Sequence, residues 1–222
     1  MRIKIDINVK DIKVNRVIKH LILADLTLWG GWGLISPVFS VFVVQKVPGA
    51  TILSVGIAAA IYWIVKSVLQ VPIAVYLDKH DGEKDDFYTL ITALMITGLA
   101  AISFLLVRSV GALFFVTLIQ AVGFGLYIPS WSSIFSRHLD REKYALDWSL
   151  DSTSVGLASG LAAFVGGGLV SLWGFPAVFI FGSVLSFTSA LTLIMVPNLV
   201  LPKPTREADV IIKDHAPLDI NK

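Results

Sequence analysis

Apolar residues along the chain gather into six runs, each close to or above the roughly 20 residues that a helix needs to cross a bilayer. We place these runs at 18–44, 52–77, 88–107, 111–135, 146–172 and 176–200. Short stretches that carry charge, glycine or proline separate them, and connections this short make successive helices antiparallel. The pattern predicts an all-α membrane protein whose six transmembrane helices form one bundle over residues 20–200.

Composition supports a membrane location. Hydrophobic residues make up 55% of the 222 residues and charged residues 15%, whereas ordinary soluble domains are roughly a quarter charged. Fifteen of the 18 lysines and arginines fall on the N-terminal segment, the second and fourth connections and the tail, while Lys46 and Arg108 stand alone on the other loops. Because basic residues are retained on the cytoplasmic side, this bias predicts an inner or plasma membrane protein with both termini in the cytoplasm.

The two ends of the chain have distinct patterns. Residues 1–19 form a basic cytoplasmic segment in which Lys10, Lys13, Arg16 and Lys19 recur at helix-like intervals. We interpret the stretch as an interfacial helix on anionic headgroups, with a solvated arm as the open alternative. Residues 201–222 are polar and mixed in charge, which predicts a flexible cytoplasmic tail.

One ten-residue pattern occurs twice. The stretch GWGLISPVFS begins at residue 31, and GFGLYIPSWS begins at residue 123, with five identical positions. The offset equals three spans, so the second copy crosses the membrane in the opposite direction. This predicts a 3+3 inverted repeat of about 18–107 and 111–200, with chance resemblance between apolar helices as the alternative. Glycine and proline loosen a helix. The predicted helix hinges are Gly31, Gly33, Pro37, Gly123, Gly125 and Pro129.

Polar side chains inside the predicted spans form three stripes at helical spacing. A charged side chain in the bilayer is costly and needs a cavity, a partner or a task. We therefore predict that the stripes line a shared aqueous cavity for a small-molecule substrate or its coupling ion. The predicted cavity residues are Asp25, Trp29, Trp32, Ser36, Tyr62, Lys66, Gln70, Thr117, Gln120, Tyr127 and Trp131. Phe124 belongs to the stripe of the fourth span.

Several of these residues allow two interpretations. Lys66 either takes part in substrate binding or ion coupling, or it forms an ion pair with a carboxylate. Asp25 is the carboxylate that pairs with Lys66, or a proton carrier, or a group that is hydrated near the membrane boundary. Trp29 and Trp32 line a binding site or pack against neighbouring helices.

These features resemble one half of a major facilitator superfamily transporter, over about residues 20–200. Gly123-Phe124-Gly125 followed by Pro129 is similar to the fourth span of that family, and the connection at 74–84 is similar to its cytoplasmic signature. The resemblance implies secondary transport by alternating access. It also implies a cytoplasmic gate loop, with residues Asp78, Lys79, Gly82 and Lys84.

Half of such a transporter needs a second half, which a parallel homodimer supplies. The fifth span carries small residues every three or four positions, a face that admits another helix backbone. The predicted dimer interface consists of Ser152, Gly156, Ser159, Gly160, Ala163 and Gly167. The resemblance also places the loop at Asp78 near the start of the partner's fifth span, around Asp147, Ser149 and Asp151. Packing within one bundle remains an alternative for the small-residue face, as do a split transporter with a different second half and a non-transporting scaffold or receptor subunit.

Other functional classes have no support in the sequence. It contains no cysteine, no nucleophile motif, no phosphate loop and no metal-ligand spacing. We therefore expect no enzyme activity, no cofactor, no metal and no nucleic-acid partner. The expected partners are the lipid bilayer, a second copy of the chain and a small solute, with proton or sodium coupling. Two copies of Lys66 around one cavity favour a polar or anionic solute.

Overall fold

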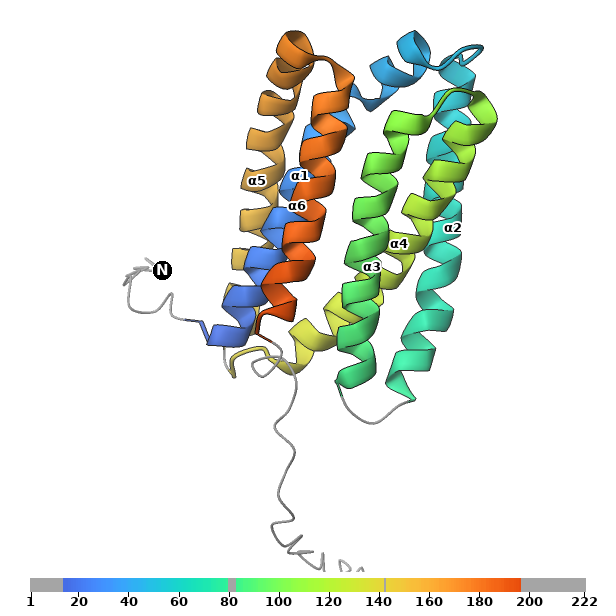
Figure 1. Cartoon of the computed structure of the whole chain (residues 1–222). Helices are drawn as coiled ribbons and strands as arrows, with labels where there is room; N and C mark the ends of the chain where they lie inside the picture. The colour runs from blue at the N-terminus through green and yellow to red at the C-terminus, as the bar shows by residue number, and fades with distance from the viewer. Residues whose placement is uncertain (1–13, 80–82, 142, 197–222) are drawn as a thin grey trace, which may run out of the picture.

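Six long helices make up the fold (Figure 1). The computed structural model describes residues 14–79, 83–141 and 143–196, and within these ranges it contains no strand. The helices are α1 (Arg16–Lys46), α2 (Ile52–Asp78), α3 (Lys84–Ser103), α4 (Val110–Arg137), α5 (Tyr144–Trp173) and α6 (Phe175–Ile194), with a 3₁₀ turn η2 (Phe104–Leu106) after α3. Each is long and apolar enough to cross a membrane. The predicted six-helix, all-α fold is confirmed.

Some predicted features cannot be placed on this structure. Most of the N-terminal segment (1–13), the tail (201–222) and Gly82 of the gate loop lie outside the described residues. With η2 counted as part of α3, two helix ends differ from the predicted spans by four or more residues, since α6 ends at Ile194 and not at 200, and α3 begins at Lys84 and not at 88. Asp85 and Asp86 lie in its first turn, where the positive helix N-terminus stabilises negative side chains. An apolar-run criterion misses such a polar first turn.

The helix ends follow from local sequence. The side chain of Asn15 accepts a hydrogen bond from the backbone N–H of Ile18 at 2.9 Å, which caps α1. Ser109 caps α4 in the same way, through the N–H of Ala112 at 3.2 Å. Only Gly174 separates α5 from α6, and it adopts a φ of 78°, a conformation that glycine tolerates without strain. These caps and turns fix where each helix starts and reverses.

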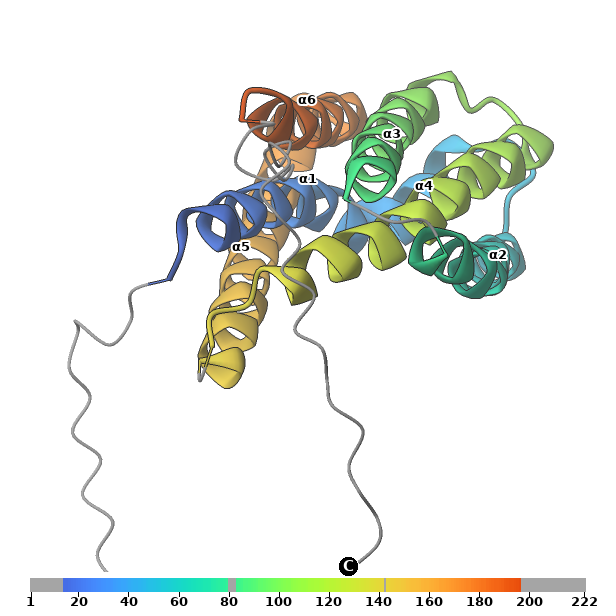
Figure 2. The same cartoon turned by 90° about the horizontal axis from the view of Figure 1, so that it is seen from below.

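The helices group into two units of three. α1 packs against α5 and α6, α4 packs against α2 and α3, and α3 and α6 contact each other across the two units. Seen from below, α3 and α6 lie along one side, whereas α5 and α2 lie at the other corners with α1 and α4 running between them (Figure 2). α1 and α4 are therefore the central helices.

Glycines on the central helices allow this close packing. A Cβ atom on Gly31 would lie 2.8 Å from the carbonyl oxygen of Gly182 on α6, and one on Gly123 would lie 2.8 Å from Cγ2 of Thr97 on α3. Gly33 likewise meets α5, and Gly125 meets α2. Both α1 and α4 run unbroken through these positions. The glycines thus serve as contact points between helices.

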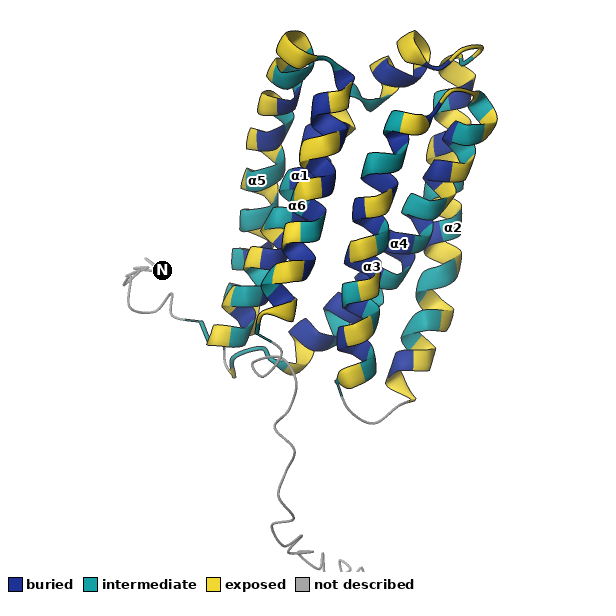
Figure 3. Ribbon diagram, in the orientation of Figure 1, coloured by how far each residue is buried: buried dark blue, intermediate teal, exposed yellow. Residues whose placement is uncertain are grey.

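Burial separates the helices further. α2 and α5 each bury only four residues, and large apolar side chains such as Val68 on α2 and Phe164 on α5 are exposed. Figure 3 shows exposed positions along much of both helices, while α1 and α4 each bury 12 residues. A second apolar environment, either lipid or protein, must cover α2 and α5.

The two ends of the bundle differ in charge. Most of the described lysines and arginines, among them Arg16, Lys79 and Arg137, lie at the end where α1, α3 and α5 begin, together with acidic residues such as Asp86 and Asp147, and we name it the basic end. At the end where α2, α4 and α6 begin, here named the opposite end, the chain carries Lys46 and Arg108.

Candidate functional site

A cavity lies between α1, α2 and α4. Its volume is about 280 Å³, and ten residues line it. Five of these were predicted cavity residues: Trp32, Ser36, Tyr62, Thr117 and Gln120. The remaining five are Ile35, Phe39, Ala58, Ala59 and Trp63, which sequence reasoning missed because apolar residues give no signal of their own within an apolar span. The predicted stripes of three helices do meet at one place.

Two buried polar atoms of residues that line this cavity have no hydrogen-bond partner within the described residues. They are the indole nitrogen Nε1 of Trp32 and the hydroxyl Oγ1 of Thr117, and both residues are buried, with exposed fractions of 7% and 2%. A buried donor or acceptor without a partner costs about 1–3 kcal/mol. Such a group is therefore expected to bind water or a ligand. Ser36 and Gln120 add further polar groups to the same wall.

An aromatic cluster backs the cavity. The ring of Phe124, on α4, contacts Trp29 at 5.5 Å, Trp32 at 5.4 Å and Tyr62 at 5.9 Å between centroids. Three helices thus meet on this ring, which is only 1% exposed. Phe124 lies between the two glycines of the repeated pattern, and that position was the available signal for its importance.

Lys66 lies next to the cavity on α2. Its ammonium Nζ is 3.9 Å from the ring centroid of Trp63 and 5.2 Å from that of Tyr62, and the residue is 9% exposed. Such a cation–π contact contributes about 0.5–2 kcal/mol. Within the described part of the chain, no carboxylate lies within ion-pair distance of Lys66. The alternative in which Lys66 pairs with Asp25 therefore does not describe this structure.

Asp25 has a different partner. Its Oδ1 accepts a hydrogen bond from the hydroxyl of Tyr127, and the residue is 4% exposed. The carboxyl group of Asp151, on α5, is its electrostatic neighbour, and Oδ1 of Asp151 has no hydrogen-bond partner within the described residues. α1, α4 and α5 therefore meet at a buried pair of carboxyl groups. Asp151 was not among the predicted cavity residues, because its position on the α1-facing side of α5 depends on how the two helices pack.

Other predicted cavity residues lie elsewhere. Trp131 stacks on Phe135 at 4.5 Å and contacts Trp148 of α5 at 5.9 Å, which places it in a separate aromatic cluster. Gln70 is half-buried one turn beyond Lys66, and it does not line the 280 Å³ cavity. The structure therefore concentrates the candidate site in the α1, α2 and α4 stripes nearer the opposite end.

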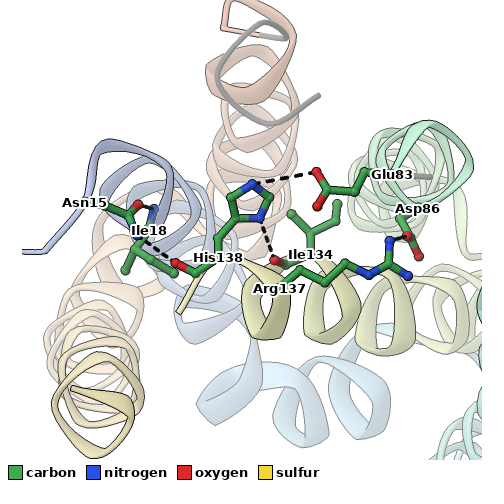
Figure 4. Close-up of polar contacts among 7 residues, drawn as sticks. All are labelled: Asn15, Ile18, Glu83, Asp86, Ile134, Arg137 and His138. Carbon is green, nitrogen blue, oxygen red and sulfur yellow. Dashed lines mark hydrogen bonds and ion pairs between the residues drawn. The ribbon is translucent and has the colours of Figure 1, made fainter. Parts of the chain in front are cut away.

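A polar network closes the basic end (Figure 4). Arg137, at the end of α4, binds Asp86 of α3 at 2.7 Å, and Asp86 is fully buried. The side chain of Asn15 donates to the carbonyl of His138 at 2.7 Å and to Oδ1 of Asp140 at 3.0 Å. The α4–α5 connection is thereby tied both to α3 and to the start of α1.

His138 adds a titratable contact to this network. Its Nε2 lies 3.6 Å from Oε2 of Glu83 (Figure 4). Burial raises the pKa of Glu83 above its ordinary value of 4.5, while the charges of His138 and Arg137 act in the other direction. The contact strengthens when His138 is protonated and Glu83 is ionised.

One of the predicted gate-loop residues, Asp78, lines a further cavity of about 380 Å³ at the basic end. Asp78 and Arg137 line it, together with Pro129, Ser132 and other residues of α2 and α4. Lys79 is exposed, and Lys84 begins α3. The two Gly–Pro segments, 31–40 on α1 and 123–132 on α4, therefore border different cavities. Trp32 and Ser36, which belong to the α1 segment, line the 280 Å³ cavity.

The small residues of α5 divide into two sets. A Cβ atom on Gly156, Gly160 or Gly167 would meet nothing within 4 Å. Ser159, by contrast, contacts Gly33 of α1. The predicted dimer face is thus largely unoccupied within this chain.

The start of α5 differs from the expectation. Asp147 and Asp151 are buried in their own bundle, with exposed fractions of 0% and 6%, and Asp147 accepts from the backbone N–H of Asp140 at 2.8 Å. Of the group expected near a partner's gate loop, only Ser149 is exposed. A contact between this region and a partner's gate loop stays a prediction.

Comparisons with known proteins place this fold. The family model of the Major Facilitator Superfamily matches residues 21–219. No curated protein sequence matches the chain. Among solved structures, the chain is similar to the POT family transporter PepTSo, with a TM-score of 0.68 and 16% sequence identity. The match covers 89% of this chain and 40% of that one, so the chain spans less than half the length of its structural neighbour. The family match, which covers most of the six helices, shows that this multi-pass membrane protein belongs to the Major Facilitator Superfamily of transporters.

Proposed function

We propose that the protein is a secondary transporter that moves a small polar or anionic solute by alternating access, along a path lined by α1, α2 and α4. Family membership supports the transporter class. The observation that carries the site is the cavity of about 280 Å³ in which Trp32 Nε1 and Thr117 Oγ1 lack partners. A solute that accepts from the indole and bonds to the hydroxyl would satisfy both groups.

The test is substrate-dependent stabilisation followed by uptake. The purified chain is screened against small solutes by thermal unfolding, and each hit is measured for uptake into proteoliposomes. Trp32→Phe keeps the ring but removes the N–H, and Thr117→Val keeps the shape but removes the hydroxyl. Each is expected to weaken apparent solute affinity roughly tenfold, the value of one hydrogen bond of about 1.4 kcal/mol.

Trp173→Phe is the matched control, because Trp173 is 65% exposed at the end of α5 and lines no part of this cavity. It is expected to bind and transport like the unmodified chain. If Trp32→Phe and Thr117→Val also leave affinity unchanged, the solute does not bind in this cavity.

The two Gly–Pro segments serve as paired gates in this proposal. Gly31 and Gly33 contact α6 and α5, and Gly123 and Gly125 contact α3 and α2. Under the proposed 3+3 inverted repeat, α6 corresponds to α3 and α5 to α2, so the partner helices match as well. The repeat and the hinge role of Pro37 and Pro129 are parts of the proposal that this correspondence supports.

The proposed coupling ion is a proton, carried by Asp25. The Asp25 carboxyl group is buried, accepts from Tyr127 and has the Asp151 carboxyl group as a neighbour. Two carboxyl groups close together in a dry site favour holding one proton between them. Asp25→Asn is expected to abolish solute accumulation driven by a pH gradient while leaving exchange of solute at equal concentrations. A sodium requirement that survives this substitution would contradict the assignment.

A parallel homodimer completes the path in this proposal. The exposed apolar side chains of α2 and the open glycine positions of α5 provide surfaces for a second bundle. The 15 basic residues on one side support the same orientation for both copies, with the basic end in the cytoplasm.

Native mass measurement in nanodiscs tests this assembly. Since the chain has no cysteine, single cysteines at Val68 and Gly160 can then be crosslinked between two differently tagged copies. Val184→Cys on α6 is the control that should not crosslink. Val184 is exposed to a similar degree as many α2 positions. Only monomers in every preparation would favour a different second half.

A further inference from the structure

A larger cavity lies at the opposite end of the bundle, apart from the proposed solute path. Its volume is about 590 Å³, and it forms where the end of α1, η2 and the α5–α6 turn come together. Its floor is aromatic, because Phe42 packs on Phe179 at 4.8 Å and Phe104 stacks on Phe179 at 5.4 Å between centroids. These three rings are at most 6% exposed. The floor is therefore packed and apolar.

Two cations line this cavity. Lys46 is the last residue of α1, and Arg108 lies in the connection between η2 and α4; both are exposed. Neither forms an ion pair with a carboxylate of the described residues. Gln45 adds an amide at the same rim.

The surrounding sequence contains no counter-charge. Residues 26–77, 87–139 and 152–206 contain no aspartate or glutamate, and every described residue at the opposite end falls within these stretches. Two like charges at the rim of an apolar cavity repel each other and create a positive potential there. This potential favours an anion from outside the chain.

This cavity is separated from the candidate substrate cavity by one aromatic contact. Phe39 lines the 280 Å³ cavity, Phe104 lines the larger one, and their rings pack at 5.2 Å between centroids. The larger cavity opens where transmembrane helices end, which is the level of the lipid headgroups. Its occupant therefore meets charge at the headgroup level and apolar surface below it.

We propose that this cavity binds an anionic phospholipid, with the headgroup phosphate on Lys46 and Arg108 and the upper acyl chain over the aromatic floor. A guanidinium binds phosphate oxygens through two parallel hydrogen bonds, and an ammonium adds a point charge. The combination of two uncompensated cations with an apolar floor distinguishes an amphiphile from a free anion.

The experiment uses the full chain in nanodiscs and the absence of native cysteine. A single cysteine is introduced at Val41, which lines the cavity and is 45% exposed, and its reaction rate with a maleimide is measured. Phosphatidylglycerol is expected to slow this reaction at least fivefold relative to phosphatidylcholine. Leu172→Cys is the control: it is 77% exposed on α5 and does not line the cavity, so its rate should not depend on the headgroup.

Charge variants then assign the effect. K46Q/R108Q, made on the Val41→Cys chain, is expected to abolish the protection by phosphatidylglycerol, and native mass measurement should show retained phosphatidylglycerol reduced at least about tenfold. K46R/R108K should keep both effects. R16Q/K19Q removes two exposed charges at the basic end and should leave the Val41→Cys rates unchanged.

Two results would overturn the proposal. Equal protection by the two lipids, or protection that survives K46Q/R108Q, would show that the cations do not hold a lipid. Protection in phosphatidylcholine nanodiscs on addition of inorganic phosphate, to the same extent as with phosphatidylglycerol, would show that the site takes a free anion.

Discussion

The two Gly–Pro segments, 31–40 on α1 and 123–132 on α4, have similar sequences but meet different kinds of atoms. A Cβ on Gly31 would meet a backbone carbonyl of α6, whereas one on Gly123 would first meet the methyl group of Thr97 on α3. A side chain can rotate away, but a helix backbone cannot move without displacing the helix. Similar sequence therefore does not give equal freedom, and the α1 segment is the more tightly held of the two.

The C-terminal ends of the same two helices show the opposite difference: here α4 is held more tightly than α1. α4 ends in Arg137, which binds buried Asp86, whereas α1 ends in exposed Lys46, which forms no ion pair with a described residue. The α4 helix is thus fixed at its C-terminal end and the α1 helix at its centre.

The largest effect is expected from Arg137→Gln. The substitution leaves the fully buried Asp86 carboxylate without its ion-pair partner, which should destabilise the fold by about 3 kcal/mol. Thermal unfolding in detergent, followed by circular dichroism, measures the loss. Lys46→Gln is the matched control and should not change stability. If both substitutions behave alike, the two helix ends are not distinguished by the Asp86 contact.

Gly31→Ala and Gly123→Ala sharpen the first contrast. Gly31→Ala should cost about 2 kcal/mol, because the new methyl group lies 2.8 Å from the Gly182 carbonyl and α6 must move. Gly123→Ala should cost about half as much, since the nearest atom there is a side-chain methyl carbon and the nearest backbone atom lies 3.2 Å away. Gly30→Ala, with open space at the new Cβ, should stabilise the helix by up to about 1 kcal/mol. Unfolding midpoints of the three variants decide the order, and equal costs at Gly31 and Gly123 would remove the distinction.

Tyr127→Phe tests a polar difference between the segments. The position 92 residues earlier is Ile35, so only the α4 segment supplies a hydroxyl, and this hydroxyl donates to buried Asp25. Its loss should cost about 1 kcal/mol. Tyr62→Phe, which removes a hydroxyl from a half-buried tyrosine of α2, should change the unfolding free energy by less than about half of that. Equal losses would mean that the Asp25 contact adds nothing.

The smallest effect concerns pH at the basic end. Because burial raises the pKa of Glu83 above 4.5, the folded state favours its protonated form. The contribution of Glu83 to the unfolding free energy is then greatest below pH 4.5 and is lost as the pH rises through the folded pKa. Glu83→Gln should remove this decline in a series of unfolding measurements at different pH. His138→Asn should keep it, because burial is the main cause of the raised pKa of Glu83. A decline that persists in Glu83→Gln must come from another group, such as Asp86.

Sequence alone predicted the six helices because transmembrane length and apolarity are set locally. It also predicted that stripes from α1, α2 and α4 lie near one another, and Trp32, Tyr62 and Thr117 do line one cavity. It did not predict the Asp25, Tyr127 and Asp151 cluster. The rotation of α5 that turns Asp151 toward α1 depends on packing at Gly33 and Gly166, which no local pattern specifies.

The ion pair and the caps of the basic end were missed for a similar reason. Asn15, Asp86 and Arg137 come from three separate places in the sequence. Each resembles an ordinary charged or polar residue at the end of a span. Only the meeting of three helix ends identifies them as a group.

The division of the six helices into two units of three has a mechanical consequence. The chain crosses between the units only twice in the described fold, through the α1–α2 turn at the opposite end and through the α4–α5 connection at the basic end. α3 and α6 are in contact between the two units, and one chain connection joins the units at each end of the bundle. In the proposed alternating access, a tilt of one unit that widens the gap at one end would narrow the gap at the other, and the hydrogen bonds from Asn15 to the α4–α5 connection would resist such a tilt.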